Sequence, residues 1–155
     1  MNKSDYTKAW KTLLMTKSRE PVALPVLSGS MHPLIQTEDV LIIQPCKAGD
    51  LHLGDIAVFS VKNRIFAHRV VFIFLTKRWK LIMEKGIQNK FPGWLKPGQV
   101  LGRGLGVKRG KQNISFLGRE NRQIQRAESC RELLKVIGEC ILIPARFILS
   151  LIRKS

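Results

Sequence analysis

Two side chains far apart in the sequence, Ser30 and His68, are the strongest candidates for chemistry in this chain. Ser30 lies in LSGSMHPLI (residues 27–35), where two hydroxyl groups and a glycine separate apolar runs. A serine hydroxyl is a weak nucleophile until a neighbouring base accepts its proton, and histidine is the most frequent base. The pair therefore indicates acyl transfer by an activated serine. The plain alternatives are a turn hydroxyl at Ser30 and a satisfied core histidine at His68.

The element that must position His68 is a strand. In IFAHRVVFIF (residues 65–74), alternation puts Phe66, His68 and Val70 on one face. Similar β-branched runs, separated by turn residues, predict a mainly β fold with a sandwich or barrel-like core. The predicted strands are residues 22–27, 40–44, 56–61, 65–74, 79–83, 100–107 and 114–116.

Three segments are expected along the chain. Residues 1–20 predict a short amphipathic helix, with Ser4 as its cap. Residues 21–118 form the β-domain. Residues 119–155 are basic and apolar and predict a helical segment, which Pro144 should kink or break.

The charge of the chain indicates an anionic partner. Its 155 residues include 27 Lys and Arg against 11 Asp and Glu, a formal net charge of +16. Basic residues are not interleaved with aromatic ones as in single-strand binders, so nucleic acid is not the expected partner. An anionic membrane surface suits the basic, apolar C-terminal segment better. A helix docked on its own domain explains that segment equally well.

Cysteine and histidine usage bears on compartment and cofactors. The odd count of Cys46, Cys130 and Cys140 argues against a disulfide framework and for a reducing compartment. The three histidines are not clustered with these cysteines, so neither a metal nor another cofactor is expected. Residues 1–20 carry charges throughout, without the apolar stretch of a secretory signal. The expected location is the cytoplasm, with peripheral association at the membrane as a further option.

A succession of short motifs adds specificity. SGSMHP is followed by EDVLIIQP, LGDIAVF, AHRVV, EKG and VLGRGLGV. This order resembles the catalytic domain of the signal peptidase I and S24/S26 serine peptidase superfamily over about residues 22–108. The layout, a helix followed by a small β-domain, resembles the minimal soluble peptidase-like members, with histidine at the base position.

The resemblance implies roles for individual residues. Ser30 becomes the nucleophile, and His68 the base, where bacterial members have lysine before Arg-Val. Ser28 matches a serine whose hydroxyl helps the Ser30 amide form an oxyanion hole, a role that needs preorganised donors. Met31 and Pro33 would shape the floor of the substrate cleft.

The chain departs from the family pattern at the acid. The family's Lys-Gly-Asp box is Lys85-Gly86-Ile87 here, and the acidic residue usually found a few positions on falls near Gly93. Glu84 is close in sequence, but adjacent strand residues face opposite ways, so its substitution for the acid is left open. Without an acid, Ser30 and His68 would act as a dyad with low turnover.

Two aspartates fit the pattern better. The family's Gly-Asp before the second strand is Glu38-Asp39 here, which keeps the aspartate. Asp55 in LGDIAVF also matches, and a structural role is expected for it.

Three functions are consistent with the sequence. The favoured one is a serine endopeptidase with a Ser30–His68 dyad, acting on a peptide or protein substrate. The second is a weakened pseudoenzyme that binds peptides or assists maturation, and its main support is the missing acid. The third is a regulator like the peptidase half of self-cleaving repressors, against which stands the lack of a helix-turn-helix segment. The sequence indicates neither the cleavage site nor the oligomeric state.

Overall fold

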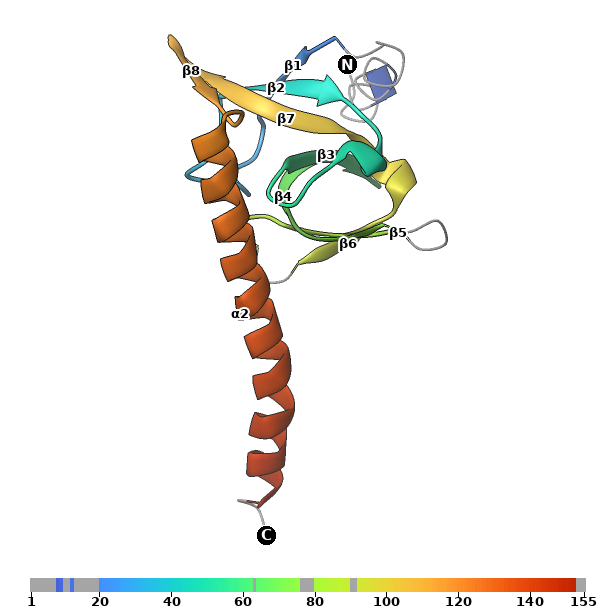
Figure 1. Ribbon diagram of the computed structural model, residues 1–155, viewed down its shortest axis with the longest axis vertical. Coiled ribbons are helices and arrows are strands. Elements are labelled where there is room, and N and C mark those ends of the chain that lie inside the picture. The colour runs from blue at the N-terminus through green and yellow to red at the C-terminus, as the bar shows by residue number, and fades with distance from the viewer. Residues whose placement is uncertain are drawn as a thin grey trace.

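One antiparallel sheet of eight strands, followed by a long helix, dominates the computed structural model (Figure 1). It describes residues 8–9, 12, 20–62, 64–75, 80–89 and 92–152. The predicted mainly β fold with a C-terminal helix is confirmed. The strands are β1 Val22–Pro25, β2 Val40–Pro45, β3 Ile56–Val61, β4 Arg64–Leu75, β5 Lys80–Lys85, β6 Gly93–Leu95, β7 Val100–Arg109 and β8 Gln112–Ser115; two 3-10 turns, Ala48–Asp50 and Pro97–Gln99, and the helix α2, Arg119–Ile152, complete the elements.

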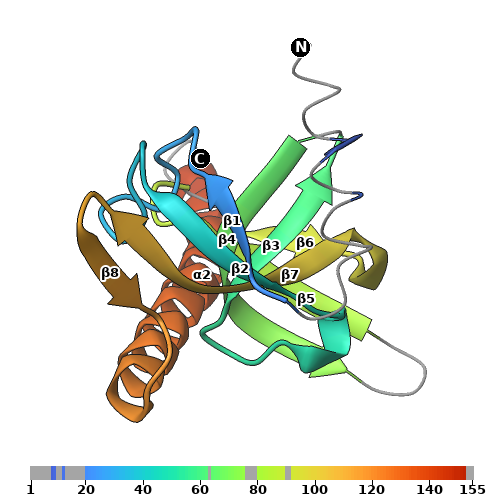
Figure 2. The same cartoon turned by 90° about the horizontal axis from the view of Figure 1, so that it is seen from above.

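The strand order is β1-β2-β7-β3-β4-β5-β6, with β8 paired to β7. The sheet curls on itself, so that β1 and β2 lie at the top of the domain in Figure 1 and β5 and β6 at the bottom, and the two pairs overlap when seen from above in Figure 2. Two apolar clusters fill it, because alternate strand residues point inward. One gathers around Leu41, Ile43 and Val58, and the other around Phe59, Val70 and Ile82.

The long strand β4 carries His68 and pairs with both β3 and β5. His68 lies opposite Ala57 of β3, while Arg69 lies opposite Lys85 and Val70 opposite Glu84 of β5. The register shifts between Val70 and Phe72, which marks an irregularity of the β-bulge kind. This pairing determines which β5 side chains share a face with His68.

The strand β6 was not predicted. Residues Pro92 and Gly93 suggested a turn, yet Gly93 begins a three-residue strand in which it lies opposite Glu84. Its shortness and its glycine hide it from pattern analysis, because glycine is depleted in strands. Pairing with β5 supplies the hydrogen bonds that its own composition does not favour.

The helix α2 begins after Gly118, whose φ of 116° suits a glycine. Pro144, expected to kink or break the helix, does not break it, since the backbone stays helical to Ile152. A proline lacks the amide that donates one hydrogen bond of the helix, and the helix continues on both sides of it. The first half of α2 packs beside the sheet and the second half extends past it (Figure 1). In the part of the chain that is described, no helix is long and apolar enough to cross a membrane. The predicted N-terminal helix lies almost wholly outside the described residues.

The start of α2 fits closely against the turn before β3. Gly54 has a φ of 92°, and a Cβ there would come within 3.1 Å of the Arg126 amide nitrogen. Asp55 organises the same turn, because its Oδ2 accepts a hydrogen bond of 2.8 Å from the His52 amide. Its carbonyl accepts another from the amide of Val70. Asp55 therefore links the turn to β4, which is the kind of structural contact expected of it.

Candidate active site

Ser30 and His68 meet at one end of the curled sheet. Ser30 lies in the nucleophile loop, residues 26–39, which connects β1 to β2. Its Oγ is 3.1 Å from Nε2 of His68, within the distance expected of a nucleophile and its base. His68 is 5% exposed and packs against the rings of Phe59 and Phe66. The structure thus brings together the two residues that the sequence singled out.

An ion pair between a buried aspartate and a partly exposed arginine holds the nucleophile loop. Asp39, 2% exposed, accepts hydrogen bonds of 2.9 and 2.8 Å from Nε and Nη2 of Arg109 on β7. The same end of the loop is tied in further by the Gln36 amide, which donates to Asp39 at 2.8 Å, and by a bond from Arg109 to the Leu34 carbonyl. The Arg109 hydrogen bonds lower the pKa of Asp39, against the opposing effect of burial, and Asp39 raises that of Arg109. The aspartate that the chain keeps at this motif is therefore a charged anchor for the loop.

The turn after β5, residues 86–89, holds the loop from the other side. The Gln88 amide donates to the Ser30 carbonyl at 3.0 Å, and its side chain donates to the His32 carbonyl at 3.2 Å. Gly86 lies against the imidazole, because a Cβ there would be 2.9 Å from Nε2 of His68. Any larger residue would push the base away from Ser30.

The carboxylate that meets the His68 imidazole is Glu84, whose part the sequence left open. Its Oε2 is 2.5 Å from Nδ1 of His68, and both side chains are buried. Adjacent residues of β5 do face opposite ways, but Lys85 is the one that points out of the site. Glu84 lies opposite Val70, on the face of His68. Only the β4–β5 register, which no local pattern encodes, could have revealed this.

The lack of a side chain at Gly93 leaves room for the carboxylate of Glu84. A Cβ at Gly93 would be 2.2 Å from Oε1 of Glu84, so the carboxylate occupies the space above the glycine. The two positions are cross-strand partners. The resemblance led us to expect an acidic residue near Gly93, and the carboxylate at this place comes from Glu84 on the neighbouring strand β5.

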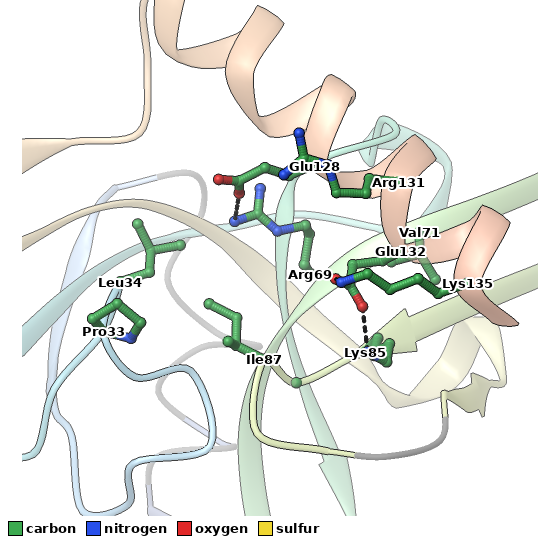
Figure 3. A pocket seen from close by; sticks show the side chains of 11 residues that line it. Pro33, Leu34, Arg69, Val71, Lys85, Ile87, Glu128, Arg131, Glu132 and Lys135 are labelled. Atoms are coloured by element: carbon green, nitrogen blue, oxygen red, sulfur yellow. Dashed lines mark hydrogen bonds and ion pairs between the residues drawn. The ribbon is translucent and has the colours of Figure 1, made fainter.

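The other expected position of the acid, Ile87, does not serve the site. Ile87 is 41% exposed and lines a second hollow, of about 380 Å³, between the nucleophile loop and α2. Figure 3 shows its side chain below Arg69 and facing Pro33 and Leu34. Pro33 therefore lies on this hollow, whereas it was expected in the floor of the substrate cleft.

The cleft beside the nucleophile has a volume of about 250 Å³ and mostly apolar walls. Ser28, Ser30 and Met31 contribute to its lining. Its walls come from residues 24–27, which cover the end of β1 and the start of the loop, and from the beginning of β4, residues 64–67. Ser28 is exposed at the mouth, beside the nucleophile.

No protein-family model matches the chain. Curated relatives do: the signal peptidase complex catalytic subunit SEC11C of Homo sapiens is 30% identical over 109 residues, covering 63% of this chain and 57% of the relative. The subunit SEC11C of Mus musculus gives the same values. The signal peptidase complex catalytic subunit SEC11 of Scheffersomyces stipitis is 34% identical over 83 residues, covering 52% of this chain and 49% of the relative. The chain spans about half the length of these relatives, and over the matched range its similarity to signal peptidase catalytic subunits supports the resemblance to the signal peptidase superfamily.

Proposed function

We propose that this chain is a serine endopeptidase with a Ser30–His68–Glu84 triad. The observation that carries the proposal is one continuous chain of polar contacts, 3.1 Å from Ser30 Oγ to Nε2 and 2.5 Å from Nδ1 to Glu84. A nucleophile, a base within reach and a group that orients the base are the arrangement that activates a serine. The peptidase-like function of the relatives points the same way.

The acylation step follows from the geometry. Glu84 accepts a hydrogen bond from Nδ1–H, which leaves Nε2 of His68 as the acceptor facing Ser30. As Oγ attacks the carbonyl carbon of the substrate, its proton passes to Nε2, and Glu84 stabilises the imidazolium that forms. Collapse of the tetrahedral intermediate breaks the C–N bond, and Nε2 returns the proton to the leaving amine. Water, activated by the same histidine, then releases the acyl group from Ser30.

The oxyanion is stabilised by the Ser30 amide and the Ser28 hydroxyl. Preorganised donors at this position are worth about 10²- to 10³-fold in rate. The Gly29 carbonyl accepts a hydrogen bond from the His32 amide at 2.9 Å, and this turn supports the backbone on which both donors lie.

The substrate is an extended peptide. β1 ends the described strand order, so its outer edge is free to pair with a peptide backbone, as in β-strand addition. A peptide lying there passes Leu27 and Ser28 and reaches Ser30. The apolar cleft then selects small apolar side chains before the scissile bond.

The alternative is a weakened pseudoenzyme that binds peptides. Its main support was the missing acid, and Glu84 at Nδ1 of His68 favours the peptidase instead. The test is a biotinylated fluorophosphonate, which an activated serine attacks with loss of fluoride. We expect labelling of the wild type and of Ser60→Ala, a matched serine outside the cleft, and none of Ser30→Ala. Wild-type labelling no greater than that of Ser30→Ala would favour the peptide-binding module.

We also propose that the protein works at an anionic membrane surface on the cytoplasmic side. Leu134, 69% exposed, and Ile137 lie on α2 near Arg131 and Lys135, a mixture that suits an interfacial helix. Binding to vesicles that contain phosphatidylserine should weaken as salt rises, since screening reduces the electrostatic part. Leu134→Glu with Ile137→Glu should reduce it further. Equal recovery with neutral and anionic vesicles at low salt would contradict this location.

A further inference from the structure

Four charged residues meet where α2 packs against the outer face of β4 and β5, the face that points away from the candidate triad. Arg69 and Lys85 are direct cross-strand partners and both point toward α2 (Figure 3). Nη2 of Arg69 is 2.6 Å from Oε2 of Glu128, and Lys85 forms an ion pair with Glu132. We call this set, Arg69, Lys85, Glu128 and Glu132, the charge clamp.

Each half of the charge clamp would be unfavourable alone. Like charges directly opposite each other on neighbouring strands repel, as do like charges four residues apart on a helix. Arg69 and Lys85 are the first case, and Glu128 and Glu132 are the second. Docking the helix on the strands turns both repulsions into two ion pairs.

Burial raises the importance of the clamp above that of ordinary surface ion pairs. The side chain of Arg69 is 4% exposed and that of Lys85 is 11% exposed. Arg69 also donates to the Gln125 carbonyl of α2 at 3.3 Å. Removing the anion would leave a buried cation without its partner, which is costly. Burial acts to raise the pKa of Glu132, but hydrogen bonds from Lys135 and Lys85 outweigh it and lower the pKa, which keeps this carboxylate ionised.

The two cations of the clamp and two members of the triad occupy neighbouring positions on β4 and β5. Arg69 follows His68, and Lys85 follows Glu84, so each clamp cation points outward where its neighbour points into the site. The β4–β5 pairing is irregular at this place, with a register shift just past Val70. A contact that fixes Arg69 against Lys85 therefore also fixes the distance between His68 and Glu84.

We propose that Glu128 and Glu132 of α2 are positioning residues that hold β4 and β5 in the register in which Glu84 reaches His68. This role deepens the proposed peptidase function and rests on it. It makes α2 part of the catalytic domain in effect, although none of its residues touches the reacting atoms. It also gives a route by which a displacement of α2 would weaken the base.

The first test reads the His68–Glu84 contact without any turnover. Long-range proton–nitrogen NMR spectra of the imidazole, at a pH of about 8 where histidine is neutral, report which ring nitrogen carries the proton. We expect the Nδ1–H form at His68 in the wild type and a shift toward Nε2–H in Glu128→Gln, Glu132→Gln and their double variant. Glu120→Gln, exposed in the first turn of α2, is the matched control. The exposed His32 and His52 serve as internal references.

The second test measures fluorophosphonate inactivation, separated into kinact and KI. We expect the double variant to lose about tenfold in kinact with KI unchanged, because small misplacements of a base are costly. Glu128→Asp with Glu132→Asp should recover part of the loss. If the double variant fails to fold, the single variants decide the matter.

The outcomes separate the two proposals. An unchanged His68 tautomer and kinact in folded Glu128→Gln and Glu132→Gln, while Ser30→Ala still abolishes labelling, would overturn the clamp alone. Wild-type labelling equal to that of Ser30→Ala would overturn the peptidase, and the tautomer would still decide the clamp.

Discussion

The two faces of the β4–β5 pair differ in their polar contacts: the inner face has a buried hydrogen bond, and the outer face has ion pairs to α2. On the inner face, His68 and Glu84 are both buried and meet at 2.5 Å, where one hydrogen bond orients a base. On the outer face, Arg69 and Lys85 meet carboxylates that are partly exposed. Both faces depend on the same register, because a slip of one residue would exchange inner and outer side chains. We therefore interpret the ion pairs of the outer face as a support for the hydrogen bond between His68 and Glu84 on the inner face.

The largest expected effect breaks the inner face. Glu84→Gln keeps the shape of the side chain but removes the charge that stabilises the imidazolium, so kinact should fall by about 10²- to 10⁴-fold. Glu132→Gln, the same change on the outer face, should cost far less. Comparable losses in the two variants, at equal thermal stability, would contradict the division of roles between the faces.

The second prediction moves the acidic side chain of the inner face from position 84 on β5 to position 93 on β6. Gly93→Asp in the wild type should disrupt the site, because even a Cβ there would overlap the Glu84 carboxylate. In Glu84→Ala the space is open, and adding Gly93→Asp should restore part of the lost kinact from the strand where the family resemblance places the acid. Gly93→Asn in the same background is the control. Equal rates for the Asp and Asn variants would show that the acid works only from β5.

Much of this architecture could be predicted, and the failures have physical causes. The β-branched runs located most strands, and the motif order paired Ser30 with His68. Glu84 stayed open because its direction depends on a register that includes an irregularity near Val70. β6 was missed because three residues beginning with a glycine carry no periodic signal. Pro144 was expected to kink or break the helix, yet the helix continues to Ile152, because one missing hydrogen bond does not end a helix of 34 residues.

A smaller effect concerns the anchor of the nucleophile loop, which lies on neither face. Asp39→Asn should lower the free energy of unfolding by about 2 kcal/mol at neutral pH, the scale of hydrogen bonds to a charged group. Because the pKa of folded Asp39 lies below its ordinary 3.8, its contribution is present above that pH and is lost as pH falls through the folded value. The stability difference between wild type and variant, from urea unfolding, should thus shrink below about pH 4. A constant difference down to pH 2 would contradict the charged anchor.

The smallest expected effect lies at Glu38, where the resemblance leads us to expect glycine. Its φ of 77° is in the left-handed region, which costs a residue with a Cβ about 1–2 kcal/mol. Glu38→Gly relieves that strain but loosens the unfolded chain, so a net gain of about 0.5–1 kcal/mol in the free energy of unfolding is expected. Thr37→Gly, beside it and with no such φ, should instead be destabilising. Neither change touches β4 or β5, so kinact should stay at the wild-type value. A rise or fall in kinact for Glu38→Gly would mean that strain in the loop is transmitted to Ser30, and the anchor at Asp39 would then be insufficient to isolate the nucleophile.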